Sequence, residues 1–281
     1  MKIGFIGAGK VGFSLGKYLA VNGEDVTGYY SRTEKSAEEA AEFTGTRSFS
    51  SLDELVKSCD TLIITAPDGA ICSVSYELAD TDIAGKTVCH CSGSLSAAEA
   101  LKGLDGKNVR RCSMHPLFPV SSRYESYKEL KNAFFCIEGD TSCAEEWDAL
   151  FRRLGNPTRM ISPDIKKKYH AACSYASNLV CGLMAESVDL LEECGFSQEE
   201  ALTALRPLAM SNIERIFQVG AVNALTGPAE RNDTGTVQKH IQCMPDDTSR
   251  EMYKAVTRKL TEMSQVRHPD ADYSEMNEML K

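Results

Sequence analysis

The chain has 281 residues, of which 42% are hydrophobic and 25% are charged, with a formal net charge of -9 at pH 7. This length favours two domains over a single core. The acidic balance argues against a nucleic-acid partner, because phosphate backbones bind to positive surfaces. No apolar run approaches the roughly 20 residues that span a membrane, and the N-terminus does not resemble a secretory signal. We therefore expect a cytoplasmic protein with no membrane partner.

The cysteines indicate a reducing environment. There are 11 of them, most within apolar runs, and no C-x-x-C pair occurs. Small buried thiols explain this pattern better than disulfides do. Cys89, His90 and Cys91 lie close together in "HCSGS", but no second cysteine and histidine cluster has matching spacing. The sequence therefore predicts no metal site.

The first half of the sequence alternates strand and helix patterns. Short apolar runs predict strands at 2–9, 24–32, 60–68, 85–93, 109–116, 132–140 and 157–163. Helical periodicity predicts helices at 10–23, 36–45, 51–59, 71–79 and 142–155. Strands separated by helices predict a mostly parallel, doubly wound sheet, hence an α/β fold.

The second half shows only helical patterns. Apolar residues recur at helical spacing over 163–195, 197–220, 246–265 and 270–280. Ser197 is a predicted helix cap with acidic residues in the turn that follows. The sequence therefore predicts an α/β domain at 1–162 and an all-α domain at 163–281.

The glycines near the N-terminus predict a dinucleotide site. Gly7, Gly9 and Gly12 form G-x-G-x-x-G directly after a predicted strand and at the start of a predicted helix. This spacing allows a tight turn, a close approach of the backbone to a pyrophosphate, and close packing of helix on strand. The residues between these glycines belong to the same predicted site: Ala8, Lys10 and Val11. The first domain is thus predicted to be a Rossmann domain.

The end of the second predicted strand indicates which coenzyme binds. An acidic residue there would favour NAD and repel a 2′-phosphate. This chain instead has Ser31, Arg32 and Thr33. An arginine can donate charge-assisted hydrogen bonds to the 2′-phosphate, so the sequence predicts NADP. Ala66 and Pro67, at the end of a buried strand, are expected beside the same coenzyme.

Substrate-binding candidates follow from the same topology. Ligands of open α/β sheets lie at the carboxyl ends of the strands. Ser92 and His115 follow two of the predicted strands there. Ser92 offers a hydroxyl group, and Pro116 keeps the backbone of His115 extended. A purely structural hydrogen bond is the alternative role for this histidine.

A polar row at the start of the long helix predicts the catalytic groups. Lys166, His170, Ser174 and Asn178 are each four residues apart, so they follow one side of a helix. Lys166 is the predicted proton donor, with His170 as the alternative. Ser174 and Asn178 are expected to orient the substrate.

A third segment, "LTGPAERND", lies between two predicted helices. Thr226 belongs to a turn, and Arg231 is a candidate for holding a substrate carboxylate through two parallel hydrogen bonds. Asp233 or Thr234 is expected to cap the helix that follows.

These segments together resemble a known family. The glycine motif, "HCSGS", "HPLFP", "YHAACSYASN" and "LTGPAERND" are similar to a group of oxidoreductases with a Rossmann-like domain and a helical C-terminal domain long described as of unknown function. That group includes an alternative type of ketopantoate reductase. The resemblance implies NADPH-dependent reduction of 2-dehydropantoate to pantoate, in pantothenate synthesis, by a homodimer that pairs through its helical domain. Related enzymes have K-x-x-x-N on the corresponding helix, whereas here His170 takes the asparagine position.

Two other functions are compatible with the sequence. One is a reductase of a cyclic imine of the pyrroline-5-carboxylate kind. The other is a non-catalytic NADP-binding protein whose helical domain contacts a partner. The polar row around His170 argues against the second, because coenzyme binding alone does not require it.

Overall fold

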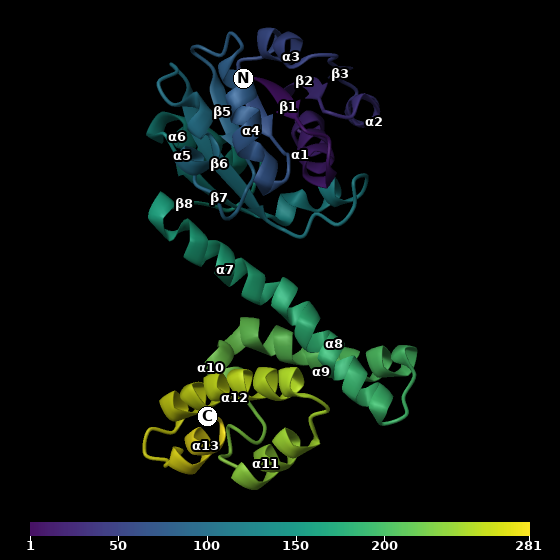
Figure 1. The fold of residues 1–281 in the computed structure, drawn as a ribbon, viewed down its shortest axis with the longest axis vertical. Helices are drawn as coiled ribbons and strands as arrows, with labels where there is room; N and C mark the ends of the chain where they lie inside the picture. The colour runs from purple at the N-terminus through teal and green to yellow at the C-terminus, as the bar shows by residue number, and fades with distance from the viewer. The chain divides into compact units, whose positions relative to one another are not determined.

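The computed structural model describes all 281 residues, which form two compact units, Met1–Asn178 and Leu179–Lys281 (Figure 1). The first unit contains the sheet and the second is helical. The predicted boundary at 162 lies earlier in the chain, because residues 163–178 pack with the sheet-containing unit. None of the helices is both long enough and apolar enough to cross a membrane.

An eight-stranded sheet with the order β3-β2-β1-β4-β5-β6-β7-β8 forms the centre of the first unit. Its strands pair in parallel except for β6 with β7, which pair antiparallel. The predicted doubly wound α/β fold is confirmed. The strands are β1 (Lys2–Ile6), β2 (Asp25–Tyr30), β3 (Arg47–Ser48), β4 (Thr61–Ile64), β5 (Thr87–His90), β6 (Arg110–Leu117), β7 (Phe134–Gly139) and β8 (Thr158–Met160). The two-residue β3 had no strand pattern of its own in the sequence.

Helices cover both faces of this sheet, and the central strands bury both sides. In β4, Ile63 belongs to one apolar cluster while Leu62 and Ile64 belong to the other, as the two-residue period of a strand requires. One cluster includes residues of α1 (Lys10–Val21), α2 (Glu34–Thr44) and α6 (Thr141–Arg153). The other includes residues of α3 (Leu52–Ser58), α4 (Asp68–Ala79) and α5 (Ala97–Ala100). The short 3₁₀ helices are η1 (Lys102–Leu104), η2 (Ser126–Lys128), η3 (Leu130–Asn132) and η4 (Pro163–Ile165).

The long helix predicted at 163–195 is interrupted. It forms α7 (Lys166–Ala176) and α8 (Asn178–Glu193), separated by Ser177, whose φ of -129° and ψ of -81° are not helical. The Ser177 hydroxyl donates to the Cys173 carbonyl at 2.8 Å. Local hydrogen bonding by serine competes with the helical ladder, and a 3.6-residue apolar period does not reveal such a break.

The second unit is entirely helical, as predicted. After α8 it contains α9 (Gln198–Val219), α10 (Ala221–Ala224), α11 (Thr234–Cys243), α12 (Asp247–Arg267) and α13 (Ser274–Met279). Ser197 and Glu200 form a capping box at the start of α9. The Asp233 carboxylate accepts from the Thr236 amide, so Asp233 rather than Thr234 caps α11. Val237, Ile241 and Met276 belong to a small core that α11 and α13 share.

Candidate active site

The glycine loop joins β1 to α1 and leaves the helix N-terminus open. Gly9 precedes α1 and makes no side-chain cap, so the first amide groups of the helix are free for a ligand. A Cβ atom at Gly12 would lie 2.5 Å from the Gly7 carbonyl oxygen and 2.7 Å from Thr65 Oγ1. Thr65 in turn donates to that carbonyl at 2.8 Å. Only glycine fits at position 12, and the loop is held to the end of β4.

A cavity of about 430 Å³ lies against this loop. Its lining includes three predicted residues from the end of β2, Ser31, Arg32 and Thr33, and it includes Ala66 and Pro67 from the end of β4. Gly7, Ala8 and Gly9 line it as well, whereas Lys10, Val11 and Gly12 do not. The glycine turn, the open helix end and an arginine in one cavity fit the pyrophosphate and 2′-phosphate of NADP.

The serine hydroxyl groups that follow β5 are hydrogen-bonded to an acidic side chain. Ser92 Oγ and Ser94 Oγ each donate to Asp68 Oδ2 at 2.8 Å. The Ser92 amide donates to His90 Nδ1 at 3.1 Å. Burial lowers the pKa of His90 to about 3, so this imidazole is neutral at pH 7. The predicted substrate ligand Ser92 is only 5% exposed, and its hydroxyl group already serves to position Asp68.

Two histidines and a tyrosine meet where β6 faces α7. His115 Nδ1 lies 2.7 Å from the Tyr169 hydroxyl, and the His115 and His170 rings pack edge to face with centroids 5.8 Å apart. Burial lowers the pKa of His115 to about 4 and raises the pKa of Tyr169 above its usual value of 10. Both side chains are therefore neutral at pH 7. One hydrogen bond therefore joins the Tyr169 hydroxyl and His115 Nδ1, and the histidine tautomer decides which of the two donates.

These histidines line a second cavity of about 430 Å³ within the first unit. His115, His170, Ser174 and Asn178, all predicted from the sequence, lie together there. The wall is completed by residues of the "HPLFP" segment and of α7: Pro116, Leu117, Phe118, Pro119, Cys173, Ala176 and Ser177. No lysine or arginine is among them.

Lys166 lies apart from this cavity. Its side chain is 2% exposed, and Nζ is 3.6 Å from Glu138 Oε2 and donates to Ser113 Oγ. Burial lowers the pKa of its ammonium group. The polar row predicted on one side of the helix is thus divided: its first member points into the sheet, while His170 and Ser174 face the cavity.

Thr226 and Arg231 lie in the second unit, in the loop between α10 and α11. Both are exposed. Their predicted contacts with a substrate stay a prediction.

Sequence reasoning missed several residues of these sites. Tyr169 contacts His115, Asp68 accepts hydrogen bonds from the two serines, and Arg123 lines the coenzyme cavity. Only Tyr169 had a visible signal, as the neighbour of His170. Tertiary packing alone brings together the thiols of Cys89, Cys112 and Cys143, which lie within 4.8 Å of one another in the core.

Two family models match different parts of the chain. Residues 2–93 match the model described as NADP oxidoreductase, coenzyme F420-dependent. Residues 133–260 match a domain of unknown function, DUF2520. No curated protein matches the sequence.

Solved structures share the fold at low sequence identity. A candidate NADP oxidoreductase from Bacteroides fragilis has a TM-score of 0.76 and 23% identity, covering 93% of this chain and 98% of its own. A pyrroline-5-carboxylate reductase from Coxiella burnetii has a TM-score of 0.61 and 16% identity, with 94% and 97% covered. An imine reductase from Myxococcus stipitatus in complex with NADP+ has a TM-score of 0.63 and 17% identity, with 100% of each chain covered.

The open N-terminus of α1 and Arg32 in the adjacent cavity agree with the model of residues 2–93, which describes NADP oxidoreductases. Residues 2–93 are thus similar to the Rossmann domain of NADP oxidoreductases and residues 133–260 to DUF2520, and the coenzyme is NADP(H).

Proposed function

We propose that this protein is an NADPH-dependent reductase of a small carboxylic acid that bears a carbonyl or imine group. The observation that carries the proposal is the meeting of His115 and His170 at the carboxyl end of β6, in a cavity lined by polar groups of α7. Reduction of such a double bond needs a hydrogen-bond donor and a proton donor near the atom that becomes basic. A coenzyme-binding protein without chemistry needs neither.

Each residue of the cavity has a separate role in the proposed reduction. NADPH, when bound, supplies a hydride to the substrate carbon. In this proposal the Tyr169 hydroxyl donates to His115 Nδ1, so that His115 donates a hydrogen bond from Nε2 to the substrate oxygen or nitrogen. His170 donates the proton, and Ser174 and Asn178 orient the substrate. Lys166, the first candidate from the sequence, is enclosed with Glu138 and is the weaker candidate.

The proposed substrate is 2-dehydropantoate, a 2-keto acid, which the family resemblance implies. Its carboxylate needs a cationic partner, and the histidine cavity contains no lysine or arginine. Arg231, in the second unit, stays the residue predicted from the sequence to bind a substrate carboxylate.

A cyclic imine of the pyrroline-5-carboxylate type is the second candidate. A protonated imine is cationic, so it suits a cavity without lysine or arginine and with the Asp68 carboxylate near His115 and His90. The fold shared with a pyrroline-5-carboxylate reductase and an imine reductase supports the same alternative.

The test is the oxidation of NADPH, followed at 340 nm, with a panel of 2-keto acids and cyclic imines. We expect 2-dehydropantoate to give the highest kcat/KM. Preference for pyrroline-5-carboxylate would select the imine reductase instead. Tight NADPH binding without turnover of any member would contradict both and favour a non-catalytic role.

We also propose that the protein is a homodimer that pairs through its helical unit. Within that unit α9 is exposed over most of its 22 residues, and only Ala201 is buried. Leu208 is 64% exposed and Phe217 is 86% exposed. Apolar side chains left in water along a whole helix are typical of a surface that a partner covers.

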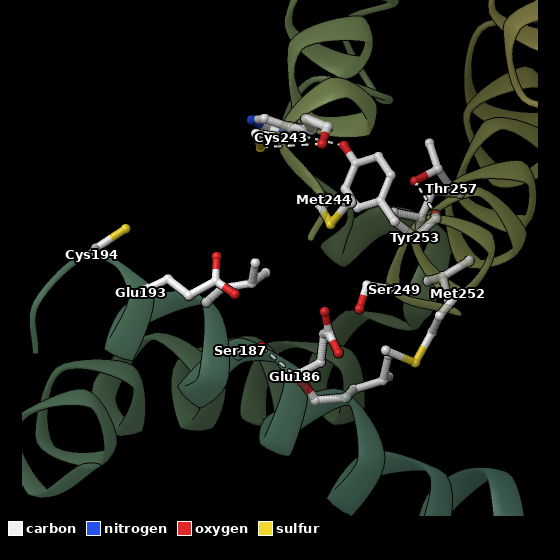
Figure 2. A pocket seen from close by; sticks show the side chains of 15 residues that line it. Glu186, Ser187, Glu193, Cys194, Cys243, Met244, Ser249, Met252, Tyr253 and Thr257 are labelled. Atoms are coloured by element: carbon white, nitrogen blue, oxygen red, sulfur yellow. Dashed lines mark hydrogen bonds between the residues drawn. The ribbon is translucent and has the colours of Figure 1, made fainter. Parts of the chain in front are cut away.

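A groove in the same unit supplies a complementary surface. It has a volume of about 690 Å³ and is lined by residues of α8, α11 and α12. Figure 2 shows Glu186 from α8 across the opening from Met252 and Tyr253 of α12. Most of the lining is apolar, which suits the leucine and isoleucine side chains that α9 of a second copy would present.

Sedimentation velocity tests the pairing. We expect the unmodified protein to sediment as a dimer and Leu208→Glu to sediment as a monomer, because a buried charge without a partner opposes association. Tyr76→Glu introduces the same charge at an exposed apolar residue of the first unit and serves as the control. A monomeric unmodified protein would contradict the proposal.

A further inference from the structure

Arg123 belongs to none of the elements from which the sequence predicted coenzyme contacts. It lies in the segment between β6 and η2, yet it lines the same cavity as Gly7, Ser31 and Arg32. Among the charged residues of that lining, Arg32 and Arg123 are cationic and Glu77 is anionic. The cavity therefore contains a second arginine that the glycine motif does not explain.

The segment around Arg123 is fixed to α1 and α2. The Ser14 hydroxyl of α1 donates to the Ser122 carbonyl at 3.2 Å. The Tyr124 ring packs edge to face against Phe13 of α1 and Phe43 of α2, with centroids 5.5 Å and 5.1 Å apart. Contacts on both sides of Arg123 thus hold its backbone beside the cavity.

The guanidinium group of Arg123 is only partly used within the protein. It lies over the Phe13 ring at 5.1 Å, and its NH1 group donates to Glu39 Oε2 at 3.3 Å, a long hydrogen bond. A guanidinium group has five N–H donors, and this side chain is 39% exposed. Most of its donors are therefore available to a ligand in the cavity.

We propose that Arg123 binds a phosphate group of NADP(H) as a second cation beside Arg32. Guanidinium groups match phosphate oxygens in geometry and charge. The coenzyme has two kinds of phosphate, the 2′-phosphate and the pyrophosphate, and the same chemistry recognises both. This inference concerns coenzyme binding alone and does not depend on which substrate is reduced.

The test measures the dissociation constants of NADPH and NADH by coenzyme fluorescence, without substrate. Arg123→Met keeps an unbranched aliphatic side chain and removes the guanidinium group, and with it the charge and the cation–π contact to Phe13. We expect the Kd of NADPH to rise about 10- to 100-fold, the usual effect of losing one charge-assisted hydrogen bond to a phosphate. If only NADPH is weakened, the contact is to the 2′-phosphate; if NADH is weakened equally, the contact is to the pyrophosphate.

Two further variants provide the reference values of Kd against which Arg123→Met is compared. Arg32→Ala should weaken NADPH at least tenfold and barely affect NADH, because Arg32 is the predicted 2′-phosphate ligand. Arg110→Met is the matched control: Arg110 is paired with Glu146 at similar exposures of 40% and 45%, in β6 at a site outside the coenzyme cavity.

A change in Kd within twofold of the Arg110 control for both coenzymes would overturn the proposal. Glu39→Gln separates phosphate binding from support of the loop. We expect it to bind NADPH as tightly as the unmodified protein or more tightly, because a carboxylate that competes for Arg123 is gone. A loss as large as that of Arg123→Met would also overturn the proposal, because Arg123 would then act only through its pairing with Glu39. Circular dichroism confirms that each variant is folded.

Discussion

Replacing His170 with alanine is expected to lower kcat about 100-fold while the Kd of NADPH stays within twofold. Loss of a general acid typically costs a factor of 10² to 10⁴ in rate. His170 lies beside His115 in the cavity formed by β6 and α7, and it does not line the coenzyme cavity. Stopped-flow measurement of NADPH oxidation, with Kd from coenzyme fluorescence, separates the two effects.

The control for the His170 variant is a variant of Lys166, the competing candidate for the proton donor. Lys166→Met alone would leave Glu138 buried without its partner, which costs about 3–5 kcal/mol of unfolding free energy. Lys166→Met with Glu138→Gln removes both charges, and we expect this double variant to fold and to lose less than tenfold in kcat. If the double variant instead loses 100-fold and His170→Ala does not, Lys166 is the proton donor.

Gly93→Ala is expected to lower kcat/KM at least 100-fold in a protein that still folds and binds NADPH. A Cβ atom at this position would lie 2.4 Å from His170 Cδ2 and 2.8 Å from His115 Nε2. Both rings must move, which disturbs the 2.7 Å hydrogen bond between Tyr169 and His115. A misplacement of about 1 Å is enough to cost a factor of about 10² in rate.

Gly69→Ala provides the comparison for Gly93. A Cβ atom at Gly69 would meet nothing within 4 Å, although the residue lies in the first turn of α4, near the same edge of the sheet. We expect its steady-state kinetics to match those of the unmodified protein. Turnover by Gly93→Ala within threefold of this variant would show that the two histidines do not need their present geometry.

Lys166 and His170 show which part of the candidate site a local sequence pattern can predict and which part it cannot. A four-residue spacing correctly placed His170 and Ser174 on one face of α7, because helical geometry fixes that relation locally. The same spacing included Lys166, which lies at the first residue of α7. There Glu138 of β7 is close enough to pair with its ammonium group, and no local pattern reveals a carboxylate so distant in the chain. The spacing also included Asn178, which lines the cavity from beyond the break at Ser177.

Arg123 and Tyr169 are residues of the candidate sites that local sequence patterns did not predict. Tyr169 is marked in the sequence only as the neighbour of His170, and nothing near Arg123 marks it as functional. Each becomes a candidate through contacts made across the fold. Arg123 comes to the coenzyme cavity because Phe13 and Phe43 hold the adjacent Tyr124. Tyr169 acquires its role because its hydroxyl reaches His115 from another element.

The sequence by itself determined the alternation of strands and helices, the glycine turn, the arginine after β2 and the helix cap at Ser197. Each of these depends on residues within a few positions of one another, where backbone geometry and local hydrogen bonds decide the outcome. Only the tertiary structure decided which side chains of α7 face the sheet and which face the cavity. The rotation of a helix about its axis is set by the surfaces it packs against, and those surfaces come from distant parts of the chain.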